Sequence, residues 1–193
     1  MNHDIEFIED GHLYLVDGVI TPSITQLLKY KFGGMYDFVN PKTLTEAAKK
    51  GTDVHKAIEE YEKEGKESDF EELRSYKLLK DLYKWKTLEN ELPVVLDIDD
   101  EVMGVGTLDL LVEIDGKLGI GDIKRTATLN KEYVAYQLNL YRMAYESTFE
   151  KQINFLFALH LRDDKRKYHK IPINEKLTME FLDEVRNEIN SAK

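Results

Sequence analysis

The chain has 193 residues, 42% of them hydrophobic and 33% charged, which is typical of one soluble globular domain. It contains no cysteine, which excludes disulfides and metal sites built on thiolates, including a cysteine-ligated iron–sulfur cluster. No apolar run approaches the roughly 20 residues of a membrane span, and the N-terminus lacks the basic and apolar parts of a signal peptide, so we expect a cytoplasmic protein.

The net charge of −10 argues against a nucleic-acid-binding protein, which usually carries a basic surface. Local charge matters more than the sum, because the Debye length at physiological salt is only about 8 Å. Basic residues gather at Lys124, Arg125 and Lys131 and again between residues 162 and 170. Both clusters are consistent with solvated loops, and the second is equally consistent with a DNA contact.

Apolar periodicity predicts most of the secondary structure. In chain order, the pattern predicts a hairpin over 5–8 and 13–16, a short helix opened by Thr21-Pro22-Ser23 and ended by 32–34, helices over 41–64 and 69–88, strands over 92–98, 102–113 and 117–124, a helix over 130–145, strands over 154–160 and 168–173, and a helix over 174–190. This order predicts an α/β fold with a mixed central sheet flanked by helices.

Two carboxylates and a lysine stand out in the middle of the chain. Asp115-Gly116 is a hairpin signal between two apolar runs, so Asp109 and Asp122 are expected on neighbouring antiparallel strands. Asp122 and Lys124 then point to the same face of the sheet. Converging carboxylates repel each other unless a cation lies between them, and oxygen-rich sites suit Mg²⁺ or Mn²⁺. A nearby lysine can orient water or stabilise a charged phosphate.

Each of these residues also has an ordinary structural interpretation. Asp109 is consistent with an exposed strand aspartate, and Asp122 with Lys124 is consistent with a solvent-facing pair. His55 lies on an apolar helix stripe, where a lone histidine is usually a core residue with one hydrogen bond. Gly51 costs about 1 kcal/mol in a helix interior, so we expect another backbone to approach it closely.

Five segments, in this order, resemble the motifs of the PD-(D/E)XK nuclease superfamily and of its RecB-like exonuclease branch. They are Gly51-Thr-Asp-Val-His55, Glu91-Leu-Pro93, Gly106-Thr-Leu-Asp109, Asp122-Ile-Lys124 and Gln137-Leu-Asn-Leu-Tyr141. They span residues 51–141, nearly half of the chain. The segment that begins at Gly18 is also similar to the opening of phage-type members, though this match is less specific.

The resemblance implies a restriction-endonuclease-like core and a metal-dependent deoxyribonuclease, most simply an exonuclease acting on DNA ends or single strands. One or two Mg²⁺ or Mn²⁺ ions would be held by His55, Asp109, Asp122 and the backbone carbonyl of Ile123, without an iron–sulfur cluster. A metal-activated water would attack the phosphate with the help of Lys124. We expect one domain, with a hairpin and short helix over 1–40, a helical segment carrying the histidine over 41–90, and the nuclease core over 91–193.

The resemblance also assigns supporting residues and partners. Glu91 would support catalysis, Gln137 would contact the substrate backbone or brace the lysine, and Tyr141 would contact DNA or pack under the site. Arg125 is expected to bind the nucleic acid. A recombinase or a single-strand-binding protein of a phage or bacterial recombination system is the implied partner. A structure-specific endonuclease, a catalytically silent binding module and a hydrolase of another phosphodiester remain open.

Overall fold

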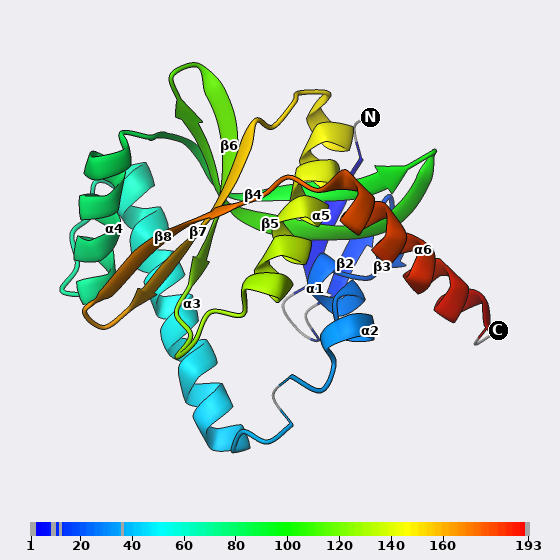
Figure 1. Cartoon of the computed structure of the whole chain (residues 1–193), viewed down its shortest axis with the longest axis horizontal. Coiled ribbons are helices and arrows are strands. Elements are labelled where there is room, and N and C mark those ends of the chain that lie inside the picture. Colours follow the sequence, from blue (N-terminus) through cyan, green and yellow to red (C-terminus); the bar gives the residue numbers. More distant parts are fainter. Residues whose placement is uncertain (1–2, 9–10, 12, 36, 192–193) are drawn as a thin grey trace.

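A mixed sheet of five strands lies at the centre of the molecule (Figure 1). The structure is a computed structural model and describes residues 3–8, 11, 13–35 and 37–191. In spatial order, the strands are β4 (Lys86–Ile98), β5 (Glu101–Ile114), β6 (Lys117–Lys124), β7 (Phe155–Arg162) and β8 (Lys165–Ile171). Neighbouring strands are antiparallel except β6 and β7, whose parallel pairing needs the long crossover that contains helix α5 (Lys131–Phe149).

Helices cover both faces of this sheet, which confirms the expected α/β fold. Helix α3 (Pro41–Glu64) and helix α4 (Glu71–Tyr83) pack on one face, where their apolar residues join Leu110 and Ile123. Helix α5 and helix α6 (Glu175–Ser191) pack on the other, where they join Leu108 and Ile120. Each face therefore has its own hydrophobic cluster.

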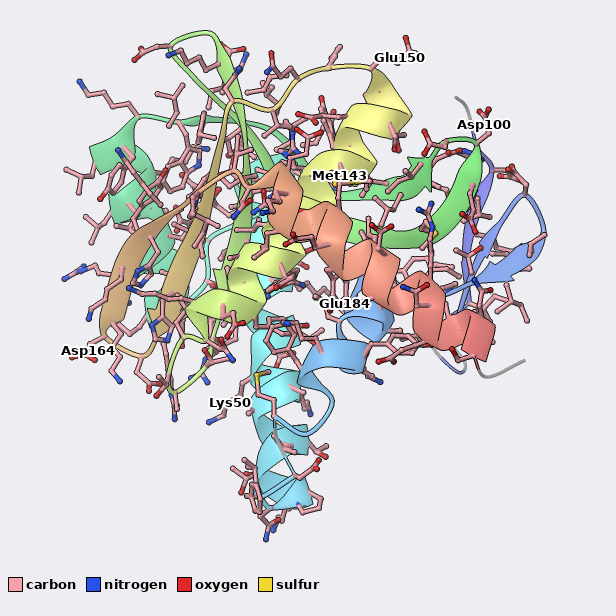
Figure 2. The ribbon with its side chains drawn as sticks, turned by 45° about the vertical axis from the view of Figure 1, so that its right-hand side comes forward. Lys50, Asp100, Met143, Glu150, Asp164 and Glu184 are labelled. Carbon is pink, nitrogen blue, oxygen red and sulfur yellow. The ribbon has the colours of Figure 1, made fainter. Side chains whose placement is uncertain are left out.

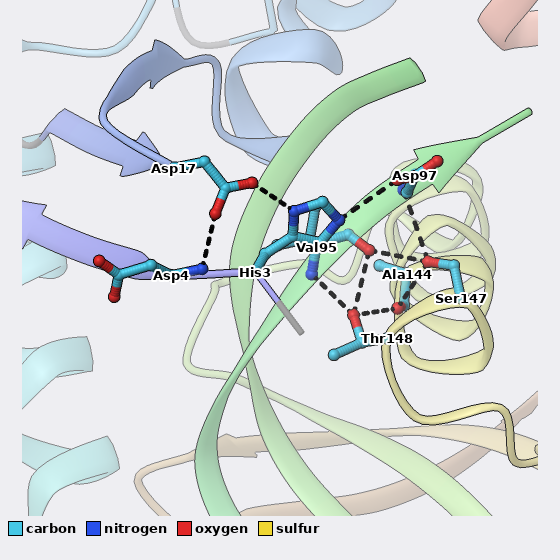
Figure 3. A network of polar contacts seen from close by, with 8 residues as sticks. All are labelled: His3, Asp4, Asp17, Val95, Asp97, Ala144, Ser147 and Thr148. Atoms are coloured by element: carbon cyan, nitrogen blue, oxygen red, sulfur yellow. Dashed lines mark hydrogen bonds and ion pairs between the residues drawn. The ribbon is translucent and has the colours of Figure 1, made fainter. Parts of the chain in front are cut away.

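A small second sheet is formed by β1 (Ile5–Ile8), β2 (Leu13–Val16) and β3 (Val19–Thr21). His3 fastens it to β4, because its Nδ1 lies 2.7 Å from Asp17 Oδ2 and its Nε2 lies 3.2 Å from Asp97 Oδ2 (Figure 3). Two short helices follow, α1 (Ile24–Leu27) and α2 (Lys29–Phe32), and Ser23 and Gln26 form a capping box at the first of them.

Some sequence-based boundaries were wrong. The helix expected over 69–88 ends at Tyr83, since Lys84 adopts a left-handed conformation with φ of 57° and β4 begins two residues later. Strand β3 was not expected. Gly51 does not adjoin another backbone, because a Cβ built there meets nothing within 4 Å. Among the described residues, no helix has the length and apolar character needed to cross a membrane.

Candidate active site

The site forms where β5 and β6 separate. Their antiparallel pairing ends at Leu110 and Gly121, and beyond that point β6 continues along β7 only. Asp109 and Asp122 would be the next pair, so the two carboxylates stand at the two sides of this fork. A fork in a sheet exposes backbone groups that must be satisfied by something other than a neighbouring strand.

Side chains satisfy the backbone of Ile123 at the fork. Its N–H donates to Asp109 Oδ2 at 2.6 Å, and its carbonyl oxygen accepts from His55 Nε2 at 2.9 Å. The isoleucine side chain is buried in the cluster formed with α3 and α4. Residues from α3 and β5 are thereby joined to β6 at one residue, Ile123.

His55, Glu91 and Asp109 form a group that could hold a metal ion. His55 Nδ1 lies 3.4 Å from Glu91 Oε1 and 3.7 Å from Asp109 Oδ1, and one ligand atom from each residue lies within 4.8 Å of the others. With the Nε2 proton on the Ile123 carbonyl, the Nδ1 lone pair faces the two carboxylates. Metal-binding histidines commonly donate their second N–H to a backbone carbonyl in this way.

Asp122 and Lys124 lie beside this group, on the side of the sheet covered by α5. Lys124 Nζ donates to Asp122 Oδ1 at 2.6 Å. The second oxygen, Oδ2, is buried and has no hydrogen-bond partner among the described residues. A buried carboxylate oxygen without a donor is costly, so a cation or a water would stabilise it.

The electrostatics of the site reflect its excess of carboxylates. Burial raises the pKa of Asp122 to about 6, against the attraction of Lys124. Burial also raises the pKa of Asp109. Burial alone would lower the pKa of His55, but Asp109 and Glu91 raise it to about 9. Burial alone would also lower the pKa of Lys124, but Asp122 and Asp109 raise it above its ordinary value. Without a metal, protons bound to these side chains therefore balance the negative charge of the carboxylates.

Glu91 reaches this group through an unusual backbone. It lies opposite Asp109 within the paired part of β4 and β5, yet its φ is 50°, in the left-handed region. For a residue other than glycine this costs about 1–3 kcal/mol, and such strain concentrates at functional sites. The sequence predicted only a supporting role for Glu91. The structure places Glu91 in the group of three possible metal ligands, and Asp122 lies outside this group.

The expected nucleic-acid contacts are enclosed by protein. Gln137 is buried, and its Oε1 has no hydrogen-bond partner in the described ranges. Tyr141 is buried with its ring over Gly106. Of the two roles expected for Tyr141, packing under the site agrees with this burial. The guanidinium of Arg125 donates to Glu72 Oε1 at 2.7 Å and to Asp163 Oδ1 at 2.9 Å. The Arg125 guanidinium thus already pairs with two carboxylates. Its contact with DNA stays a prediction.

Glu72 was missed by sequence reasoning. It lies in the first turn of α4, where an acidic residue looks like ordinary solvated helix charge. It is 4% exposed in the structure and also accepts the backbone N–H of Asp163 at 3.0 Å. It therefore ties the residue after Lys124 to the turn between β7 and β8, a contact that only the folded arrangement brings about.

Comparisons with known proteins add no functional information. No family model matches the chain, and no curated protein is similar to it. Solved structures do match, among them one titled "Crystal structure of SSO0001", at 15% identity and a TM-score of 0.39. The match covers 59% of this chain and 55% of that one, so the chain spans about half the length of the protein it matches.

The donor atoms at the site suit a hard or borderline divalent cation. One imidazole nitrogen and two carboxylates converge, with the unpartnered oxygen of Asp122 nearby. Carboxylate oxygens suit Mg²⁺ and Mn²⁺, and an imidazole favours the transition metal of the two. The chain has no cysteine to ligate an iron–sulfur cluster.

Proposed function

We propose that this chain is a divalent-metal-dependent deoxyribonuclease of the RecB-like type, most simply an exonuclease that acts on DNA ends or single strands. One observation carries the proposal. Residues from motifs far apart in the sequence, on α3, β4, β5 and β6, converge where two strands separate. Their chemistry is that of a cation site with an ammonium group beside it.

The metal would be held by His55, Glu91 and Asp109, with the free oxygen of Asp122 available to the same ion or to a second one. When bound, such an ion polarises phosphate oxygens and lowers the pKa of water. The histidine would bind through Nδ1, since Nε2 donates to the Ile123 carbonyl. That carbonyl keeps a second lone pair, so its expected role as a ligand remains part of the proposal.

Lys124 acts as a cation in this proposal. Its raised pKa keeps the ammonium group protonated at neutral pH, which suits charge stabilisation on a phosphate and not proton abstraction. Asp122 holds the amine in place through the 2.6 Å hydrogen bond. The pair therefore orients one positive charge toward the space between the carboxylates.

The proposal is tested by incubating end-labelled single- and double-stranded DNA, linear and circular, with Mg²⁺, Mn²⁺ or EDTA. Metal-dependent loss of linear DNA with circles spared supports an exonuclease, and the fate of the label gives its polarity. Cutting of circles indicates an endonuclease instead. A folded sample that cleaves nothing with either metal contradicts the proposal.

A catalytically silent binding module is the second candidate, and one observation favours it. Asp109 and His55 both satisfy the backbone of Ile123, so both have a structural reason to be present without any chemistry. Such a module would not need an ammonium group beside a free carboxylate oxygen. A protein that binds the metal in a separate measurement but cleaves nothing in the assay above would support this candidate.

A further inference from the structure

Basic side chains continue from the site to the edge of the sheet. Lys124 on β6 pairs in register with His160 on β7, and His160 pairs with Lys167 on β8. Residues paired across strands point to the same face. Strands lie about 4.8 Å apart, so Lys167 is about 10 Å from Lys124. This row leads from the fork to the outermost strand.

The two faces of β8 differ in what they contact. Tyr168 stacks on Tyr83 and Phe157, with ring centroids 4.0 and 4.9 Å away, which puts it on the face of α4. Arg166 and Lys170 share its parity and therefore that face. The face covered by α5 carries four other residues of the strand, the basic residues Lys165, Lys167 and His169 and the buried Ile171.

These side chains and Lys131 at the start of α5 form what we call the β8 basic cluster (Lys131, Lys165, Lys167 and His169). The ring centroids of His169 and His160 are 6.4 Å apart, which places His169 beside the row from Lys124. Burial lowers the pKa of His169, and the charges of Lys131, His160 and Lys167 lower it further. Around the three lysines, no ion pair is found within the described part of the chain.

Some lysines elsewhere in the protein are neutralised by glutamates. Lys63, Lys77 and Lys80 on α3 and α4 each contact a glutamate at 2.6 Å. In a chain of net charge −10, these cations gather on the face of the sheet that continues from Lys124. The acidic residues nearest in sequence are Glu132, which follows Lys131 in α5, and Asp163 and Asp164 at the tip of the β7–β8 hairpin, where Figure 2 labels Asp164. Asp163 Oδ1 accepts from Arg125 Nη2 at 2.9 Å.

We propose that the β8 basic cluster binds the phosphodiester backbone of the nucleic-acid strand whose reacting phosphate lies at Lys124. The inference rests on the proposed function and adds the path of the substrate to it. A strand of B-form DNA carries one phosphate per about 3.4 Å of axis, so the 10 Å row spans about three nucleotides. Lysines contact phosphates as point charges, so binding here is independent of base sequence.

Lysines on an edge strand also discourage pairing between molecules. That role depends on their charge at the edge and not on which face they occupy. Backbone binding, in contrast, requires the face that continues from Lys124. Strand β8 offers a matched pair of variants for this distinction, because each of its faces carries two residues that are lysine or arginine.

The test compares Lys165→Ala/Lys167→Ala with the control Arg166→Ala/Lys170→Ala. Binding of a labelled single-stranded oligonucleotide is measured in EDTA over a series of salt concentrations, after circular dichroism has shown that both variants fold. Loss of two phosphate contacts should lower the slope of log affinity against log salt by about 1.4 and weaken binding about tenfold at physiological salt. The control should keep the wild-type slope. Equal effects of the two variants, or none, overturn the proposal.

Cleavage by the wild-type protein separates this inference from the proposed function. If the wild type degrades DNA and Lys165→Ala/Lys167→Ala binds as tightly, the cluster proposal fails while the nuclease stands. If the wild type binds with the expected dependence on the face but never cleaves, the nuclease fails and the cluster is a binding surface. If the wild type neither binds nor cleaves, both are overturned.

Discussion

The carboxylate of Asp109 accepts the backbone N–H of Ile123 at 2.6 Å, where a strand partner would lie if β5 and β6 had stayed paired. Its other oxygen faces His55 Nδ1 at 3.7 Å. One side chain therefore has two tasks, since Oδ2 holds β6 in place and Oδ1 belongs to the group that could bind a metal. Substitutions that remove one task but keep the other should separate them.

Asp109→Asn keeps an acceptor for the Ile123 N–H and removes the charge, whereas Asp109→Ala removes both. In EDTA, we expect the asparagine variant to be at least as stable as the wild type, because burial disfavours the charged carboxylate and raises its pKa. The alanine variant should lose about 1–3 kcal/mol from the unpaired N–H. Thermal melts with and without Mn²⁺ measure both stabilities. The proposed site predicts that Mn²⁺ stabilises the wild type and neither variant. Equal stability of the two variants in EDTA would show that the hydrogen bond does not hold the fork.

Metal binding should strengthen as pH rises. The pKa of Asp122 is about 6 in the fold, against an ordinary value of 3.8. Its protonation therefore stabilises the metal-free fold fully below about pH 4, and this contribution is lost as pH rises through 6. His55, with a folded pKa of about 9, stabilises it below about pH 6.5 and loses this contribution through 9. A metal replaces these protons, so its affinity should rise about tenfold per pH unit for each proton displaced.

Calorimetric titration with Mn²⁺ from about pH 5 to about pH 8 measures this dependence. In His55→Gln, the part of the rise above about pH 6 should disappear, because no imidazole proton is then displaced. A metal affinity that is flat over this range in the wild-type protein would exclude both groups as ligands.

Periodicity predicted the strands that carry the site, because Leu108 and Leu110 alternate with polar residues as strand residues do. It failed at residues 86–91, where Lys, Leu and Glu favour a helix and the sequence continues that of α4. In the structure these residues pair with β5, so tertiary pairing decides against local propensity. A left-handed turn at Lys84 makes the change of direction.

The site could be predicted in kind but not in arrangement. The carboxylates and the lysine of the central hairpin follow from turn and strand patterns. That β5 and β6 part just at Asp109 depends on β7 pairing with β6 from the other side, which no local pattern reveals. The left-handed backbone that brings Glu91 to His55 is equally invisible, because glutamate carries no preference for it.

Lys124→Ala should abolish cleavage without unfolding the protein. Loss of a positive group that stabilises the reacting phosphate costs on the order of 10²–10³ in rate. Folding is retained because Asp122, left without its partner, can take up a proton. Mn²⁺ affinity should be unchanged or higher, since a cation beside the metal is gone. Lys124→Arg keeps the charge and serves as the control, and wild-type cleavage by the alanine variant would contradict the assignment.

Arg125 should contribute to stability and not to chemistry directly. Arg125→Ala leaves the buried carboxylate of Glu72 without its cation, and breaking a buried pair costs about 3–5 kcal/mol. The control is Arg74→Ala, which removes an exposed ion pair with Glu71 on the same helix and should cost about 0–1 kcal/mol. Urea unfolding measures both, and equal losses would show that the Glu72 contact is not a buried pair in solution.

Two motif glycines should respond in opposite directions to alanine. A Cβ at Gly106 would lie 2.9 Å from Tyr141 Cε1, and the buried ring has little room to move, so Gly106→Ala should cost about 1–3 kcal/mol. A Cβ at Gly51 meets nothing within 4 Å in the middle of α3, so Gly51→Ala should stabilise the fold by about 1 kcal/mol. Adding Tyr141→Leu to Gly106→Ala should recover part of the loss, because the smaller side chain makes room for the methyl group. Urea unfolding of the three variants decides, and a destabilised Gly51→Ala would contradict the open space around this position of α3.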